Sequence, residues 1–169
     1  MTSRASATAA RMRRGLPPVL AHDAEVLILG SFPSTASLAA RQYYAHPRNQ
    51  FWPIMGALLN EPLAALSYRE RTARLTMHRL GVWDTIVACR RAGSLDAAIR
   101  DAEMGEIERV RRVARHLHTV AFNGRTAGRA EEMWRAAGYE TRVLPSTSPA
   151  HTMPFEQKLA AWRAVLRGP

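Results

Sequence analysis

Two short stretches in the first third of the chain constrain its fold and function most. Residues 26–30, Val-Leu-Ile-Leu-Gly, form an apolar run that continues into Ser-Phe-Pro-Ser at residues 31–34. Such a run is typical of a buried strand opening onto a tight loop, where open α/β folds bind their ligands. Residues 43–52, Tyr-Tyr-Ala-His-Pro-Arg-Asn-Gln-Phe-Trp, then combine aromatic with polar side chains. Solvated loops rarely carry so many aromatics, so this composition predicts a binding site for a flat polar ring.

Strand-like and helix-like segments alternate along the rest of the chain. We expect strands at residues 25–30, 82–88, 119–122 and 139–144. We expect helices at residues 51–59 (beginning near Asn49), 67–79 (after a capping-box Ser67), 106–116, 125–137 and 155–166. In the helix at 106–116, Ile107, Val110 and Val113 have inward-facing spacing. Residues 90–95 read as a loop, with a polar helix possible from Ser94. This alternation predicts an α/β protein with a short parallel sheet of about four strands flanked by helices.

The composition predicts one basic domain. At 169 residues and 47% apolar content, the chain is long enough for a single domain with a sizeable core. Its 24 Lys and Arg exceed its 14 Asp and Glu, giving a formal net charge of +10, which favours an anionic partner such as nucleic acid. Residues 1–15 carry no acidic residue and read as a flexible basic arm ahead of a single domain at 16–169.

The remaining composition predicts where the protein works. Cys89 is the only cysteine, so no intramolecular disulfide is possible and a reducing compartment is expected. No apolar run approaches the roughly 20 residues that span a bilayer. We therefore expect a soluble, monomeric, cytoplasmic protein of a bacterium, working at the nucleoid and without a membrane partner. With no cysteine cluster and no His-Glu-x-x-His motif, we expect no metal and no other cofactor.

The unusual residues fall in three loops that follow predicted strands, at 31–49, 123–125 and 145–154. Because the carboxyl ends of parallel strands share one edge, these loops can converge there. Asn49 precedes a predicted helix, so it reads either as an N-cap or as a site residue. Asn123-Gly124 is expected either to form a turn or to use the Asn123 carboxamide as a hydrogen-bond donor and acceptor for the edge of a nucleobase. The stiff, polar stretch 145–154 reads either as a connector or as a DNA-contacting loop with His151 or Met153 at its tip.

These motifs together resemble the uracil-DNA glycosylase superfamily, and most closely its hypoxanthine (deoxyinosine) DNA glycosylase branch. The likeness is carried by residues 29–34 (Leu-Gly-Ser-Phe-Pro-Ser), 43–52, 81–84 (Gly-Val-Trp-Asp), 89–96, 122–124 (Phe-Asn-Gly) and 144–149. It covers roughly residues 17 to 166. It implies a three-layer αβα fold and hydrolysis of the N-glycosidic bond of a deaminated base flipped out of double- or single-stranded DNA, as in base excision repair.

The resemblance also implies roles for individual residues. Phe32 stands where many relatives carry an Asp or Asn that positions the attacking water, and by analogy Asn49 takes over this task. Asn123 resembles the residue that holds the base, and Phe51 resembles the aromatic that stacks on it. His151 departs from the Asn more often seen in this branch, which puts the details of backbone contact or base release in question.

We therefore predict three groups of site residues. The catalytic group is Asn49 and Asn123, and the base-binding group is Gly30, Ser31, Phe32, Phe51 and Asn123. The DNA-contacting group is Ser34, Arg48, Ser146, Ser148, His151 and Met153.

Two alternatives remain open from the sequence. The first is an enzyme of the same fold that acts on uracil or on G·T and G·U mismatches. The second is a basic nucleic-acid-binding module without catalysis, although such a module would not need two asparagines beside an aromatic shelf.

Overall fold

A parallel four-stranded sheet organises the molecule, as the alternation of strands and helices predicts. The computed structural model describes residues 10–166. The sheet contains β2 (Val26–Gly30), β3 (Leu80–Asp84), β6 (Thr119–Asn123) and β7 (Glu140–Leu144), in the order β3-β2-β6-β7. All three neighbouring pairs are parallel. The carboxyl ends of all four strands therefore lie at one edge, where the loops after them meet.

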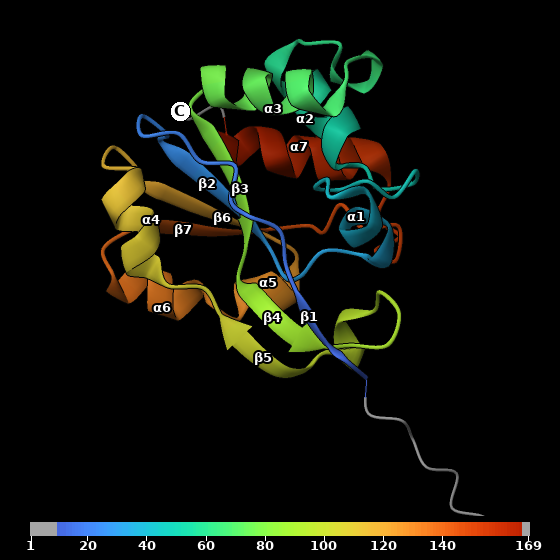
Figure 1. Ribbon diagram of the computed structural model, residues 1–169. Coiled ribbons are helices and arrows are strands. Elements are labelled where there is room, and N and C mark those ends of the chain that lie inside the picture. Colours follow the sequence, from blue (N-terminus) through green and yellow to red (C-terminus); the bar gives the residue numbers. More distant parts are fainter. Residues whose placement is uncertain (1–9, 167–169) are drawn as a thin grey trace, which may run out of the picture.

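Helices cover both faces of this sheet, giving three layers (Figure 1). On one side lie α2 (Phe51–Leu59), α3 (Tyr68–Met77) and α7 (Phe155–Leu166). On the other lie α4 (Ile107–Val113), α5 (Arg125–Gly128) and α6 (Glu131–Ala136). A short helix, α1 (Thr35–Ala40), follows β2, and a 3-10 turn, η1 (Leu63–Ala65), joins α2 to α3. The predicted three-layer α/β fold is confirmed.

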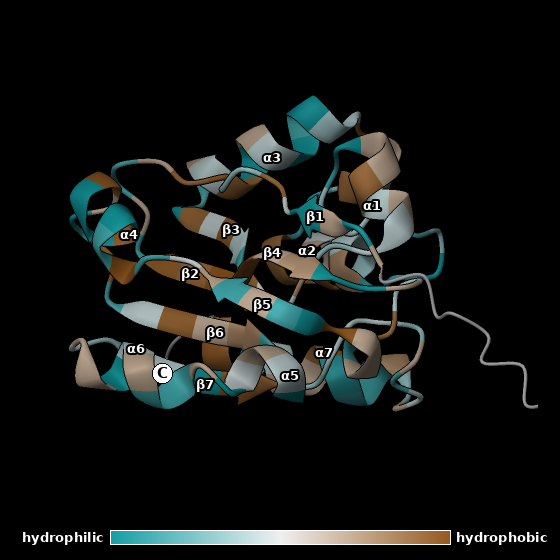
Figure 2. Ribbon diagram, turned by 60° about the horizontal axis from the view of Figure 1, so that its bottom comes forward, coloured by the Kyte–Doolittle hydropathy of each residue, from teal (hydrophilic) through white to brown (hydrophobic). Residues whose placement is uncertain are grey.

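Burial explains why the central strands form. Leu27, Ile28 and Leu29 of β2 have no exposed surface, because the two central strands have helices on both faces. Figure 2 shows the corresponding hydrophobic colour along β2 and β6. At the start of α3, the predicted capping box is present: Glu70 N–H donates to Ser67 Oγ, and the Glu70 carboxylate accepts from Ser67 N–H. This arrangement satisfies two backbone donors that the first turn of a helix leaves free.

One predicted strand proves to be two strands in different sheets. The stretch predicted at 82–88 divides at Thr85, where β3 ends and β4 (Ile86–Arg90) begins. β4 belongs to a small antiparallel sheet with the order β1-β4-β5, in which β1 is Met12–Arg14 and β5 is Arg100–Met104. The expected polar helix from Ser94 is therefore wrong, since that region holds only a 3-10 turn, η2 (Asp96–Ala98), followed by β5. All five β5 residues are exposed, so no apolar alternation marked this strand in the sequence.

Three smaller predictions also need correction. Residues 12–14 of the predicted flexible arm form β1 (Met12–Arg14), which pairs with β4, whereas residues 1–9 lie outside the described part of the chain. The helix predicted at 125–137 is split into α5 and α6. Val113 is 43% exposed because α4 ends there, so it does not join Val110 in the core. Between residues 10 and 166, no helix has the length and apolarity needed to cross a membrane.

Candidate active site

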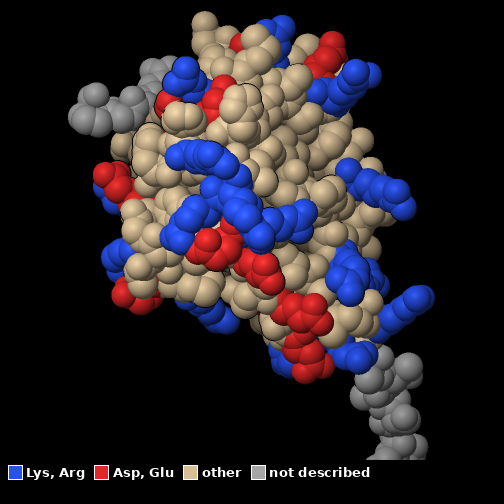
Figure 3. Space-filling model, turned by 60° about the vertical axis from the view of Figure 1, so that its left-hand side comes forward, with Lys and Arg blue, Asp and Glu red and all other residues tan. Residues whose placement is uncertain are grey.

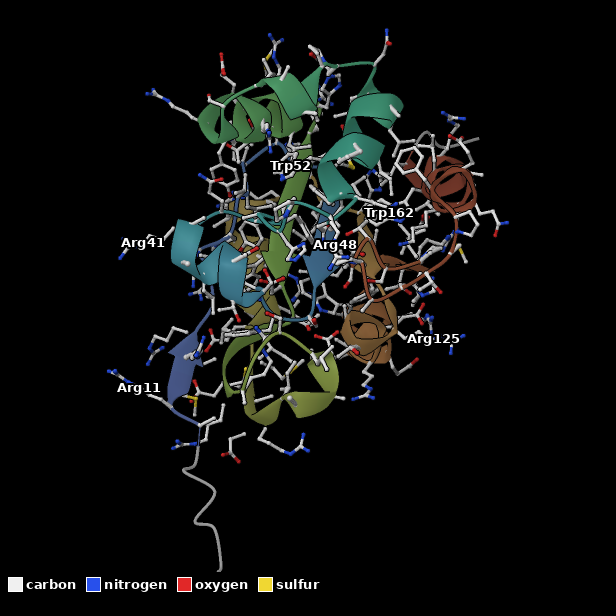
Figure 4. The ribbon with its side chains drawn as sticks, turned by 90° about the vertical axis from the view of Figure 1, so that its right-hand side faces the viewer. Arg11, Arg41, Arg48, Trp52, Arg125 and Trp162 are labelled. Atoms are coloured by element: carbon white, nitrogen blue, oxygen red, sulfur yellow. The ribbon has the colours of Figure 1, made fainter. Side chains whose placement is uncertain are left out.

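A pocket of about 290 Å³ lies at the carboxyl edge of the parallel sheet. Its walls come from the loops after β2, β4 and β7, together with the ends of β2, β3 and β6. Figure 4 views this side of the molecule, with Arg48 near the centre and Arg41 and Arg125 on opposite sides. Predicted site residues that line the pocket are Gly30, Ser31, Phe32, Ser34, Asn49, Asn123, Ser146, Ser148 and His151. Other lining residues, not predicted, include Tyr44, Asp84, Leu95, Asp96 and Thr147.

Thr147 joins three of the converging loops. Its N–H donates to Asn123 Oδ1 at 2.9 Å, and its Oγ1 accepts from Asn123 Nδ2 at 2.9 Å. Its carbonyl accepts from Gln50 N–H at 3.0 Å, at the start of α2. Thr147 has no exposed surface. The bonds hold Asn123 and the neighbour of Asn49 around one buried threonine, so the two predicted asparagines share a single pocket.

Asn49 lines the pocket, and it directly precedes Gln50, which is the N-cap residue of α2 in place of Asn49. Asn49 Oδ1 accepts from Phe51 N–H at 2.9 Å, which satisfies a free donor in the first turn of α2. The residue is half-buried. A carboxamide oxygen has two lone pairs, so this bond leaves one acceptor site and both N–H donors for a ligand or water. The bond also fixes the orientation of the side chain.

Phe51 does not reach the pocket surface, which corrects its predicted contact with the base in this structure. It has no exposed surface, and its ring packs edge-on against Trp52 and Trp162. The ring of Tyr44 stacks over it, with centroids 4.0 Å apart. Because Phe51 begins α2 and faces the core, Tyr44 instead presents an aromatic group to the pocket. The cluster of aromatics in residues 43–52 was the available signal for this role.

Asp84 is a site residue that the predicted groups omitted. It ends β3 opposite Gly30, is 5% exposed and lines the pocket. Its Oδ2 is buried without a hydrogen-bond partner in the described part of the chain. Burial, reinforced by the charge of Asp96 and opposed by that of Arg91, raises the pKa of the Asp84 carboxyl to about 7. In the sequence, the signal for this residue was the apolar run at residues 80–83, which ends at Asp84.

Hydrogen bonds from the loop after β4 fix the outer wall of the pocket. Ser31 Oγ donates to Asp96 Oδ1 at 2.7 Å, and Thr35 N–H donates to Ser94 Oγ at 2.9 Å. These two bonds flank Leu95, whose side chain is 65% exposed at the pocket rim. A fixed and exposed leucine at the mouth of a polar pocket is a feature that the sequence did not indicate.

The buried guanidinium of Arg91 holds the loop after β2 in place. It donates to the carbonyls of Pro33 and Gly93 and lies over the ring of Phe32, 5.0 Å from its centroid. Phe32 is buried in a small cluster with Ile86 and Cys89. The side chain of Phe32 therefore anchors the loop, although the residue also lines the pocket.

The loop after β7 is held by the only lysine of the protein. Lys158 Nζ, on α7, donates to the carbonyl of His151 at 2.7 Å and to that of Ser148 at 3.4 Å. His151 itself is exposed at the rim. Of the predicted DNA-contacting residues, Arg48 is exposed and Met153 half-buried, and neither lines the pocket. Their assignments, like those of Ser34, Ser146, Ser148 and His151, remain predictions about a larger surface.

The fold and site define an α/β protein whose polar, partly aromatic pocket lies where parallel strands end. Comparison with known proteins specifies the class further. Residues 17–167 match the family model of the Uracil DNA glycosylase superfamily. The chain therefore belongs to the uracil DNA glycosylase superfamily.

Individual relatives are similar over nearly their whole lengths. A hypoxanthine DNA glycosylase of Methanosarcina barkeri is 37% identical over 155 residues, covering 92% of this chain and 98% of the relative. Another, from Methanosarcina acetivorans, is 39% identical over 156 residues, covering 92% and 99%. A solution NMR structure of a provisionally assigned uracil DNA glycosylase from Methanosarcina acetivorans has a TM-score of 0.85 and 39% identity, covering 93% of this chain and 98% of that one.

Proposed function

We propose that this protein is a monofunctional DNA glycosylase that hydrolyses the N-glycosidic bond of hypoxanthine in DNA, as the first step of base excision repair. The observation that carries this proposal is the shared pocket, in which Asn49 and the Asn123–Thr147 junction surround a cavity of about 290 Å³. Both curated relatives are hypoxanthine DNA glycosylases. We further propose that it acts as a monomer in the cytoplasm of a bacterium, at the nucleoid.

Asn49 is the group that we propose positions the attacking water. A carboxamide does not accept a proton as a carboxylate does, so Asn49 is not a general base. Its oxygen has one lone pair left after accepting from Phe51 N–H, and this lone pair can hold a water below C1′. The glycosidic bond then loosens toward an oxocarbenium-like state, and placement of the water supplies much of the rate enhancement. Hydrogen bonds to the departing base supply a further part, by spreading its developing negative charge.

The DNA-binding surface that we propose surrounds the mouth of the pocket. Arg48 projects from this side (Figure 4), and the exposed rim includes His151 and Leu95. A leucine held at the rim is suited to fill the gap left by a flipped nucleotide, as apolar wedges do between base steps. This role explains why Leu95 is exposed to solvent, since it takes no part in the hydrophobic core.

Arginines on the side of α4 and α6 are a weaker candidate for DNA contact. Figure 3 shows basic and acidic side chains lying together on that face. Arg111 pairs with Glu108, and Arg135 pairs with Glu131 and Glu132 at 2.7 and 2.8 Å. These ion pairs reduce the local positive charge. The net charge of +10 nevertheless favours DNA overall, so affinity should fall steeply as salt rises, because phosphate contacts release counterions.

An incision assay tests the proposed function. The purified protein is incubated with duplexes that contain one inosine, uracil, xanthine or G·T pair, and abasic sites are cleaved with alkali. We expect cleavage at inosine, and we expect Asn49→Ala to abolish it while DNA affinity changes little. Cleavage confined to uracil or G·T would replace the proposed substrate and keep the enzyme class. DNA binding without cleavage of any substrate would support the non-catalytic alternative.

A further inference from the structure

Two buried polar groups in the pocket have unused hydrogen-bonding capacity. The Oδ2 atom of Asp84 has no partner among residues 10–166. The hydroxyl of Tyr44 lies beside the Asn123 carboxamide, and its own proton has no acceptor among those residues. Buried polar atoms are nearly always hydrogen-bonded, because an unpaired one costs about 1–3 kcal/mol. Both residues line the pocket, so a bound ligand can supply the missing partners.

The two side chains converge on the space beside Gly30 that a side chain would fill. A Cβ built on Gly30 would lie 2.5 Å from Asp84 Oδ1 and 3.1 Å from the Tyr44 hydroxyl. The absence of a side chain at Gly30 is therefore what lets a carboxyl group and a phenol meet at one point of the pocket. Neither side chain is free to turn away. Asp84 is at the end of a buried strand, and the ring of Tyr44 is stacked on Phe51.

A hydroxyl and a carboxylate side by side make a defined chemical pattern. The carboxylate accepts a hydrogen bond, and the hydroxyl can donate one. The complementary ligand edge presents an N–H next to a carbonyl, which is a lactam. Hypoxanthine has this edge, as do xanthine and uracil. Adenine, the parent of hypoxanthine, instead presents an amino group next to a ring nitrogen lone pair, which would face the carboxylate and be repelled.

We propose that Asp84 and Tyr44 read the lactam edge of the flipped base. The Asp84 carboxylate accepts from the ring N–H, and the Tyr44 hydroxyl donates to the adjacent carbonyl. This inference deepens the proposed function, on which it rests, by assigning base selection to a carboxylate and a phenol. The predicted base reader, Asn123, has both ends of its carboxamide bonded to Thr147. In this assignment Asn123 supports the wall of the pocket and is not its selective element.

The charge state of Asp84 makes the selection depend on pH. The charges that shift the pKa of Asp84 from neighbouring elements are those of Asp96, which raises it, and Arg91, which lowers it. Tyr43, Tyr44 and Tyr68 also face Asp84, whose charge raises their own pKa values. Burial is the largest influence and raises the pKa of Asp84 to about 7. Above this pH the ionised carboxylate accepts the lactam N–H and repels adenine. Below it, the protonated carboxyl can donate to the adenine ring nitrogen, so the preference for hypoxanthine should weaken as pH falls.

Affinity for uncleavable nucleotides tests the inference separately from catalysis. Duplexes carry 2′-fluoroarabino-inosine or 2′-fluoroarabino-adenosine, whose fluorine stabilises the glycosidic bond, and Kd is measured between pH 5.5 and 8. We expect the wild-type preference for the inosine analogue to rise with pH through about 7. In Asp84→Asn the amide can pair with either edge, so the preference at pH 8 should fall roughly 10-fold or more and lose its pH dependence.

Two further variants keep the test decisive. Tyr44→Phe retains the ring stacked on Phe51 and removes only the hydroxyl, so it should lose roughly 10-fold of the preference and keep the pH dependence. Asp101→Asn is the matched control, because Asp101 is an exposed β5 carboxylate outside the pocket and asparagine tolerates its positive φ of 51°. It should behave like the wild type.

The outcomes separate the two proposals. Equal affinity of the wild type for both analogues, or an unchanged preference in Asp84→Asn and Tyr44→Phe, would overturn the base-reading assignment even if inosine is excised. Absence of excision by the wild type would overturn the proposed function, whereas a preference for the inosine analogue that depends on Asp84 and Tyr44 would still support the assignment.

Discussion

Gly30 and Asp84 face each other at paired positions of β2 and β3, so closely that a methyl group on Gly30 would lie 2.5 Å from Asp84 Oδ1. We predict that Gly30→Ala destabilises the protein by about 1–3 kcal/mol and strongly reduces excision, because the carboxyl must move and the pocket changes shape. Urea unfolding and single-turnover excision measure the two effects. Gly15→Ala is the control, since its Cβ would meet atoms only at an ordinary 3.4 Å. Wild-type excision by Gly30→Ala would show that the close approach is dispensable.

The raised pKa of Asp84 predicts how stability depends on pH. Its folded pKa of about 7 lies above the ordinary value of 3.8, because burial disfavours the charged form. The folded state therefore holds its proton more tightly, and this contribution to stability is fully present below pH 3.8 and lost as pH rises to about 7. The loss is at most roughly 4 kcal/mol, at 1.36 kcal/mol for each pKa unit.

We expect Asp84→Asn to remove this pH dependence. The neutral amide avoids the cost of a buried charge, so the variant should be more stable than the wild type at pH 8 while selecting its base less well. Urea unfolding at several pH values between 4 and 8 measures the difference. A wild-type slope retained in Asp84→Asn would show that another group is responsible.

The junction at Thr147 predicts a position that is sensitive to the loss of one hydroxyl. Thr147→Val keeps the shape of the side chain but leaves Asn123 Nδ2 without its acceptor. An unpaired buried donor costs about 1–3 kcal/mol, and Asn123 should lose its fixed orientation. We expect lower stability in urea and slower excision. Thr72→Val, whose hydroxyl bonds only to the backbone of its own helix, should change stability by less than about 0.5 kcal/mol.

Leu95 at the pocket rim predicts a difference between paired and single-stranded substrates. Flipping from a duplex leaves a gap that the leucine can fill, whereas single-stranded DNA has no such gap. We therefore expect Leu95→Ala to slow excision of inosine from duplex DNA roughly 10-fold and to change the rate on single-stranded DNA little. Single-turnover rates on the two substrates give the ratio. Met77→Ala is the control, because Met77 is an exposed residue at the end of α3. Equal slowing on both substrates would argue against a wedge.

Local sequence patterns determined the parallel sheet, most of its helices and the convergence of three loops. The short apolar run of β2, followed by loop residues, predicts a buried strand, and Ser67 with Glu70 starts a helix through bonds three residues apart. The bond from Phe51 N–H to Asn49 Oδ1 is equally local. These features depend on near neighbours along the chain, so they could be derived from it.

Tertiary structure decided the rest, because the deciding contacts join residues distant in sequence. β4 leaves the parallel sheet to pair with β1 and β5, and no pattern within residues 82–88 marks that division. Phe51 and Tyr44 are both aromatic, and packing against Trp52 and Trp162 in the folded chain makes Phe51 the fully buried one. Asp84 reads as the polar end of a strand until Gly30 is placed beside it. Its burial and missing partner, and so its chemistry, arise from the folded arrangement alone.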